Sequence, residues 1–147
     1  MVATAREAKS AELTWIRLMR VYQQIDRRTA ALMRTHGLSV SRFDVLNHAG
    51  AKEGRTQQEL ADALFVTKGN VCQVLDGMER DGLLYRQRRG RENRIFLTET
   101  GTALREQSLA DQRRLIADAL GSLSTDEQHQ LQSLLRTIDL HLGHQEG

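Results

Sequence analysis

Apolar residues recur at helical spacing along most of the chain. Between residues 8 and 35 they form a stripe wider than an ordinary surface helix buries, which predicts a long helix that packs on two sides. Gly37 is expected to end that helix. A second helix is expected to begin at the N-cap Ser39 and to stop at Gly50. The first third of the chain is therefore predicted to be helical.

Two short capped helices are expected next. Residues 56–59 (TQQE) have the spacing of a capping box, which predicts a helix from Thr56 to about Leu64. After a brief turn, Thr67 is expected to cap another helix that runs to about Arg80, where Asp81-Gly82 stops it. One face of this helix is predicted to be buried, because four apolar residues follow the i, i+3, i+4, i+7 pattern: Val71, Val74, Leu75 and Met78.

A hairpin and two more helices complete the pattern. Two short apolar runs, 83–85 and 95–97, bracket a polar stretch with Gly90 at its middle, which is typical of a β-hairpin. The helical pattern returns over 99–120, and a second capping box at Ser124–Glu127 opens a last helix. The predicted fold is mainly α with a small β-hairpin wing. It is a winged helix-turn-helix (38–100) with dimerisation helices at the N-terminal (1–37) and C-terminal (101–147) ends.

Charge is concentrated in the predicted hairpin. The chain carries a net charge of only +2, but the nine residues 86–94 (RQRRGRENR) hold five arginines against one acid, Glu92. A local basic patch on a near-neutral body indicates contact with a polyanion; the alternative is a solvated run of charge. The rest of the composition predicts a soluble cytoplasmic protein: there is a single cysteine, no membrane-length apolar run, and no secretory signal in the first ten residues.

The helix pair and the hairpin together predict binding to double-stranded DNA. In a helix-turn-helix the second helix enters the major groove and the first crosses the backbone. Asn70 and Gln73 are suited to adenine edges, Lys68 to phosphate or guanine, and Gly69 permits close approach. The alternative is an ordinary solvated face, which the adjacent basic hairpin disfavours. The candidate DNA-binding residues are Thr56, Gln57, Thr67, Lys68, Gly69, Asn70, Cys72, Gln73, Arg86, Arg88, Arg89, Arg91 and Arg94.

The hairpin arginines fall into two groups by position. Arg88, Arg89 and Arg91 lie nearest the predicted tip and are expected to carry most of the DNA contact. Arginine suits phosphates and the narrow minor groove, where the potential is most negative. Arg86 and Arg94 lie at the base of the hairpin and could instead brace its strands.

Three motifs give the central segment its resemblance to a known family. TQQELA (56–61), VTKGNV (66–71) and LDGMERDGL (75–83) together resemble the DNA-binding core of the MarR family, and LTETG (97–101) resembles its exit from the wing. The resemblance spans about residues 38–101. It implies a homodimeric regulator, expected to be a repressor, that binds a pseudo-palindromic operator. It also implies release by a small aromatic or phenolic ligand.

The chain departs from the family pattern in the wing and in the recognition helix. Arg91 matches the arginine that contacts DNA in the family. Arg89 occupies the position where the family usually has an aspartate that orients this arginine. Glu92 or Asn93 is the expected substitute for that aspartate. Gln73 occupies a place where arginine is frequent, so the operator preference of relatives should not be transferred to this chain.

A ligand cleft is the remaining candidate site. Aromatic and polar residues on or near the first two predicted helices suit an aromatic ligand, although each could instead belong to the core or a dimer interface. No cofactor is predicted, and no metal site, because only two of the five histidines, His141 and His144, are close in sequence. Cys72 is interpreted as a small packing or groove-facing residue, with redox control the lesser alternative. No catalytic motif is present, so an enzyme is not expected, and a helical interaction module is the stronger rival. The candidate cleft residues are Trp15, Met19, Tyr22, His36, Phe43 and Asp44.

Overall fold

The computed structural model describes residues 2–64 and 68–143, with Lys68 described through its backbone alone. Thr67 and His144, singled out above, lie outside the described residues. The chain forms two compact units, residues 1–113 and 114–147. The first unit contains the helix-turn-helix, the sheet, the two helices that precede them and the first part of the helix that follows, and the second contains the rest of that helix and the last helix.

The N-terminal helix α1 spans Ala5–Thr35, so it begins three residues earlier than the apolar stripe indicated. The reason is a capping box: Thr4 Oγ1 accepts from the Glu7 N–H, and Glu7 Oε2 accepts from the Thr4 N–H at 2.7 Å. The helix ends as predicted, with Gly37 at a φ of 70°. The N–H groups of Gly37 and Leu38 close the last turn in the Schellman pattern.

Helix α2 spans Val40–Ala51 and is capped by Ser39, whose Oγ accepts from the Arg42 N–H at 3.1 Å. The prediction that Gly50 stops this helix was wrong, because the helix continues through it. A Cβ at position 50 would collide with the side chain of Arg105. The glycine therefore makes room for a neighbouring helix, and the turn with positive φ comes later, at Gly54.

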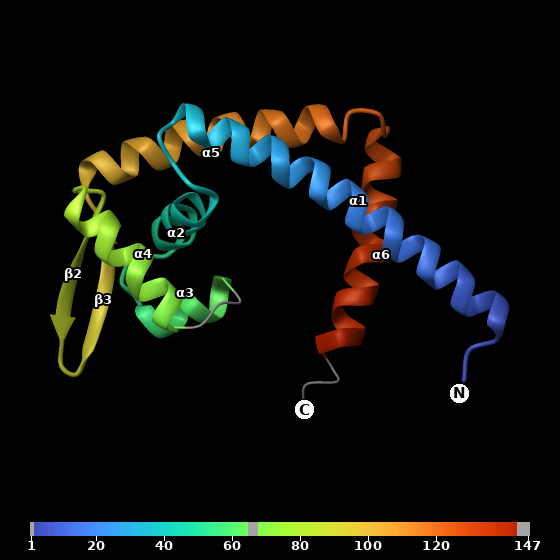
Figure 1. Ribbon diagram of the computed structural model, residues 1–147, viewed down its shortest axis with the longest axis horizontal. Coiled ribbons are helices and arrows are strands. Elements are labelled where there is room, and N and C mark those ends of the chain that lie inside the picture. The colour runs from blue at the N-terminus through green and yellow to red at the C-terminus, as the bar shows by residue number, and fades with distance from the viewer. Residues whose placement is uncertain (1, 65–67, 144–147) are drawn as a thin grey trace. The chain divides into compact units, whose positions relative to one another are not determined.

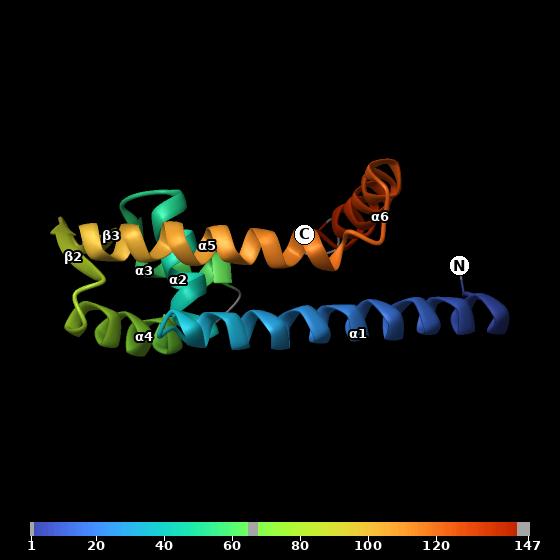
Figure 2. The ribbon, with the colours of Figure 1, turned by 90° about the horizontal axis from the view of Figure 1, so that it is seen from above.

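The helix-turn-helix consists of α3 (Gln57–Leu64) and α4 (Lys68–Arg80). Both lie beside the hairpin formed by β2 (Leu84–Arg89) and β3 (Glu92–Leu97), as Figures 1 and 2 show. A two-residue strand that the sequence pattern did not predict, β1 (Arg55–Thr56), pairs with the other edge of β3. The antiparallel sheet therefore has the order β1-β3-β2.

The hydrophobic core lies between the helix-turn-helix and the sheet. Its fully buried apolar side chains come from the end of α1, from α2, α3 and α4, and from both hairpin strands, so these elements form one packed body. Helix α5 (Glu99–Ala119) follows the wing, and α6 (Thr125–Gly143) begins at the predicted capping box of Ser124 and Glu127. The largest side chains in the core are Phe43, Met33, Leu46, Leu60, Leu75, Met78, Leu84 and Ile95.

Candidate nucleic-acid interface

Helix α4 presents a polar face to solvent. Asn70, Gln73 and Asp76 are exposed, whereas Val71 and Leu75 on the other side are buried. Among the described residues, and apart from its chain neighbours and the backbone of its own helix, no atom comes within 4 Å of the place where a Cβ would lie at Gly69, so this side of the helix start is open to close approach. The structure therefore groups these predicted readers on one accessible helix face.

Contacts at its C-terminal end hold α4 in place. The helix stops at Gly82, whose φ is 76°, and the N–H of Leu83 reaches back to the carbonyl of Met78 at 2.9 Å. Arg42 Nη1 on α2 donates to Asp81 Oδ2 at 2.6 Å. These contacts fix the direction in which α4 leaves the core.

The wing is a regular hairpin with a two-residue turn. Its strands pair from Leu84 with Leu97 to Arg89 with Glu92, which leaves Gly90 and Arg91 as the turn. Gly90 has a φ of 65°, a conformation that glycine adopts without strain. The register places the three predicted tip arginines, Arg88, Arg89 and Arg91, at the solvent-exposed end.

The exposed arginines differ in how they are held. Arg88 Nε donates to the Gly90 carbonyl at 3.2 Å, and the Arg89 guanidinium lies 5.4 Å from the centre of the Phe96 ring. Within the described residues, Arg91 makes no hydrogen bond or ion pair with the chain. Its guanidinium is free to take a phosphate or the minor groove.

The two arginines at the base of the wing brace the structure. Arg86 forms ion pairs with Asp76 and Glu79 on α4, each at 2.7 Å. Arg94 donates to the Gly54 carbonyl at 2.9 Å and pairs with Glu92 at 3.0 Å. Of the two roles predicted for this pair, the structure shows the bracing contacts. Glu92 is thus engaged by Arg94 rather than by Arg91, contrary to its expected role as a substitute for the family aspartate.

The electrostatics of Arg86 follow from its surroundings. Burial alone would disfavour the charged guanidinium, but the hydrogen bonds and charges of Asp76 and Glu79 outweigh it. The pKa of Arg86 is therefore raised above its ordinary value. Arg86 is held as a cation that is already paired within the chain.

The start of α3 meets the wing tip at a polar pocket. Thr56 is buried, and its Oγ1 accepts from the Glu59 N–H at 3.1 Å, so its side chain caps the helix as predicted. Gln57 and Gln58 line a pocket of about 280 Å³ together with Thr56 and the tip residues Arg91, Glu92 and Asn93. The wing and the first helix of the helix-turn-helix therefore present one continuous polar surface.

Comparison with known proteins agrees with this geometry. The MarR family model matches residues 36–95, which contain α2, the helix-turn-helix and most of the wing. Over these residues the chain is similar to the MarR family. The chain is a DNA-binding transcription regulator of the MarR type, and regulators of this type are not enzymes.

Individual relatives cover nearly the whole chain. A helix-turn-helix-type transcriptional regulator of Bacillus cereus is 28% identical over 92% of this chain and 93% of its own length. A MarR family protein of Mycobacterium tuberculosis, solved with salicylic acid, is 27% identical with a TM-score of 0.68, over 82% of this chain and 92% of that one. MepR of Staphylococcus aureus, solved in complex with DNA, shares the fold at 23% identity and a TM-score of 0.77, over 85% and 94% of the two chains.

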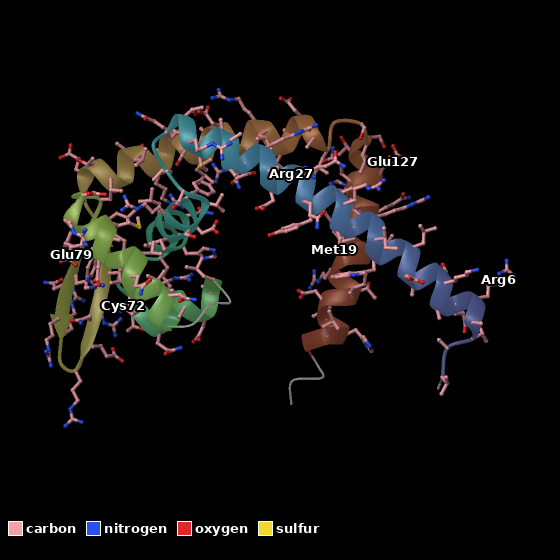
Figure 3. All side chains as sticks on the ribbon, viewed as in Figure 1. Arg6, Met19, Arg27, Cys72, Glu79 and Glu127 are labelled. Atoms are coloured by element: carbon pink, nitrogen blue, oxygen red, sulfur yellow. The ribbon has the colours of Figure 1, made fainter. Side chains whose placement is uncertain are left out.

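The six residues predicted to line a ligand cleft do not come together as one site in this protein. Phe43 is buried in the core, and Trp15 on α1 is 60% exposed. His36 Nε2 lies 2.8 Å from Asp111 Oδ2 on α5. Met19, labelled in Figure 3, lies on α1 and lines none of the pockets described here. Tyr22 and Asp44 share a pocket of about 230 Å³, and the other four predicted residues do not line it.

Asp44 lines two pockets, a feature that the sequence pattern did not reveal. The first is shared with Tyr22, Asp26 and Gln112. The second, of about 360 Å³, lies between α2 and α4 and includes Asn70 and Gln73. Burial raises the pKa of Asp44, the charge of His48 lowers it, and the charge of Asp26 raises it, with a net upward shift. A partly buried carboxyl group on α2 thus borders α4.

Over residues 2–64 and 68–143, no three histidine, cysteine, aspartate or glutamate side chains gather as a metal site would require. No helix in the same ranges is long and apolar enough to cross a membrane. Cys72 is half-buried on α4 with no disulfide partner.

Proposed function

We propose that this protein is a homodimeric repressor that binds a pseudo-palindromic operator and is released from it by a small aromatic or phenolic ligand. Residues 38–100 form the DNA-binding part of this proposal, while residues 1–37 and 101–147 form the dimer. The protein acts in the cytoplasm, where it blocks access to a promoter. The observation that carries the proposal is the exposed polar face of α4 beside an exposed arginine wing.

Each part of the interface has a distinct task on DNA. Asn70 and Gln73 on α4 read base edges in the major groove, and Gly69 lets the helix backbone come close. Arg88, Arg89 and Arg91 at the wing tip contact the phosphates or the adjacent minor groove. The pocket of Gln57 and Arg91 accepts a backbone phosphate, which fixes the register of the protein without reading sequence.

Exposed apolar side chains on two helices support the dimer. Trp15 on α1 is 60% exposed and Leu134 on α6 is 64% exposed, and each stands among further exposed apolar residues of its own helix. Apolar surface of this extent is costly in water and is typical of an interface. A second copy of the chain would bury it, and two-fold symmetry then places two α4 helices in major grooves about one helical turn, or ~34 Å, apart. The exposed apolar residues are Leu13, Trp15, Ile16, Leu18, Val21 and Tyr22 on α1, and Leu131, Leu134, Leu135, Ile138, Leu140 and Leu142 on α6.

The ligand step is supported by the pockets at Asp44 and by one relative. The Mycobacterium tuberculosis protein has been solved with salicylic acid, a small phenolic compound. In this chain, Tyr22 offers an aromatic wall to one pocket, and Asn70 and Gln73 border the other. A ligand that binds more tightly to a form in which the reading helices no longer match the two half-sites would shift the population away from DNA.

A gel-shift titration tests the proposal. The purified protein is titrated against the intergenic DNA next to its own gene, at two salt concentrations, with excess competitor DNA. A discrete complex that survives the competitor and dissociates on addition of salicylate or a related phenol supports all parts of the proposal. Weak binding that modest salt abolishes for every DNA would contradict a specific operator and favour a helical interaction module. A specific complex that no aromatic compound disturbs would remove the ligand step alone.

A further inference from the structure

Arg86 occupies a different environment from its neighbour Arg88 on the same strand. The two are separated by one residue and therefore point to the same face of β2. The Arg88 side chain is exposed, whereas that of Arg86 is 17% exposed. Figure 3 shows Glu79 and Cys72 on α4, the helix to which Arg86 is bound. Position on one strand thus gives two arginines of identical chemistry different surroundings.

The contacts of Arg86 join the wing to the reading helix. Its Nη1 donates to Glu79 Oε2 and its Nη2 to Asp76 Oδ1, both at 2.7 Å, and Nη2 also lies 3.5 Å from the Cys72 carbonyl oxygen. Asp76 and Glu79 are three residues apart and so lie on the same side of α4. We call Arg86, Asp76 and Glu79 the Arg86 clasp.

The charges of the Arg86 clasp argue against a role in phosphate binding. One guanidinium faces two carboxylates, so the group carries a net negative charge. A phosphate that approached Arg86 would have to displace a paired carboxylate and would meet the repulsion of the other. Free arginines at the wing tip offer the same phosphate a better site.

We propose that Arg86 is a positioning residue rather than a DNA contact: the Arg86 clasp fixes the wing against the reading helix so that both meet one operator half-site together. Two separate elements bind DNA more tightly when their spacing is fixed before binding, because less conformational entropy is then lost when the complex forms. The clasp provides this spacing by charge-assisted hydrogen bonds across the turn between α4 and β2. The inference rests on the proposed function, in which α4 and the wing bind the same half-site.

The proposal predicts an unusual direction of change in operator affinity when the two carboxylates are neutralised. Removing negative charge next to DNA ordinarily tightens binding to any sequence, because repulsion by the phosphates is relieved. If the Arg86 clasp positions the wing, the double variant Asp76→Asn, Glu79→Gln should bind the operator about tenfold more weakly. Its affinity for non-specific DNA should be unchanged or higher. Loss of specificity on removal of acids distinguishes positioning from simple electrostatics.

The experiment compares matched variants of the full-length protein. Affinities for the operator and for a scrambled duplex are measured over a range of salt for wild type, Arg86→Gln, Arg86→Lys, Arg88→Gln, and the double carboxylate variant. The double variant Glu12→Gln, Glu53→Gln, which changes two exposed acids outside the clasp, controls for the loss of two negative charges. Thermal unfolding checks that each variant is folded. Hydrogen exchange of the β2 and β3 amides is followed without DNA, so that one measurement does not depend on an operator.

We expect Arg86→Gln to lose about tenfold in operator affinity, with the slope of log K against log salt on scrambled DNA unchanged, and to show faster exchange in the wing. Arg88→Gln should lower that slope by about one. Arg86→Lys should restore part of the operator affinity. Combining Arg86→Gln with the carboxylate changes should add little further loss, because all three side chains serve one contact.

Several results would overturn the inference. One is a drop in salt slope for Arg86→Gln equal to that of Arg88→Gln, which would make Arg86 a phosphate contact. Another is tighter operator binding by the double carboxylate variant, and a third is additive loss in the combined variant, which would make Asp76 an independent base reader. If wild type shows no preference for the operator, the proposed function fails. In that case hydrogen exchange of the wing amides still tests the Arg86 clasp. Exchange in Arg86→Gln that is unchanged from wild type would reject the clasp independently of the proposed function.

Discussion

Gly101 packs against the carbonyl group of Leu83, so closely that a Cβ at position 101 would overlap the carbonyl oxygen. The same carbonyl accepts from the Thr98 N–H at 3.1 Å, and Thr98 Oγ1 in turn accepts from the Gly101 N–H at 3.0 Å. Thr98 also donates to the Gly82 carbonyl at 2.6 Å. The first turn of α5 is thus seated on the turn that leads from α4 into the wing.

Replacing Gly101 by alanine should destabilise the protein. The clash is with backbone and not with a flexible side chain, so the chain must shift, at a cost of about 1–3 kcal/mol in the free energy of unfolding. Urea denaturation measures this loss. Gly69→Ala is the control, because a Cβ there has open space and alanine is the better helix former. An unchanged urea midpoint for Gly101→Ala would show that the contact yields easily.

Asp44→Asn should stabilise the protein at neutral pH. The pKa of Asp44 is raised in the folded state, above its ordinary value of 3.8, so folding favours the protonated form. The stability that this preference gives the folded state is complete at pH values below the ordinary pKa, and it is lost as the pH rises through the raised pKa. The neutral asparagine should therefore give a higher urea midpoint than wild type at pH 7, and the difference should vanish near pH 3.5.

The measurement for Asp44 is a pair of urea titrations at the two pH values. Glu12→Gln, an exposed acid on α1, controls for the loss of a negative charge. A stabilisation that is equal at both pH values would contradict the link to ionisation. The asparagine would then act through packing or hydrogen bonding.

Arg91→Ala should weaken binding to every DNA sequence by a similar factor. Arg91 makes no hydrogen bond or ion pair with the described residues and lines the polar pocket at the start of α3, so its charge is available to phosphate. Loss of one phosphate contact should reduce the salt slope by about 0.9. Arg6→Ala on α1 removes the same charge away from the interface (Figure 3) and should leave the slope unchanged. A loss confined to the operator would instead make Arg91 a reader of base edges or groove width.

Leu134→Glu should shift the protein from dimer to monomer at micromolar concentration. Leu134 is among the most exposed apolar side chains of α6, and a carboxylate there could be buried against a second copy only at a large cost. Light scattering after size-exclusion chromatography gives the mass. Gln132→Glu places the same charge two residues away on the helix, at a position that is already polar, and should remain dimeric if the apolar stripe is the interface. A monomeric wild type would refute the dimer itself.

Local signals in the sequence predicted most of the helices and the hairpin. Caps at Ser39, Thr56 and Ser124 act over three residues, so their effect can be seen without knowledge of the fold. The same holds for Gly37 and Gly82, where positive φ ends a helix. Gly50 shows the limit of such reasoning, because that glycine accommodates Arg105, which lies far along the chain.

The candidate site was harder to predict because its contacts are tertiary. The exposed face of α4 follows from helical periodicity, but the roles of Arg86 and Arg94 depend on what the strands pack against. Strand β1 has only two residues and is defined by its partners Arg94 and Ile95, so no local pattern reveals it. The ligand-cleft hypothesis grouped residues by chemistry and neighbourhood in sequence, and the fold then buried Phe43 and exposed Trp15.

Thr56 is at once the last residue of β1 and the N-cap of α3. A single inserted or deleted residue here would break the register with Arg94 and uncap the helix together, so evolution has little freedom to change length at this joint. The turn at Gly90, by contrast, only joins the two strands of the hairpin. Adding one residue to each strand there would lengthen the wing without changing the pairing below. Among relatives of this protein, variation in interface length should therefore accumulate at the wing tip, and the junction before α3 should stay constant.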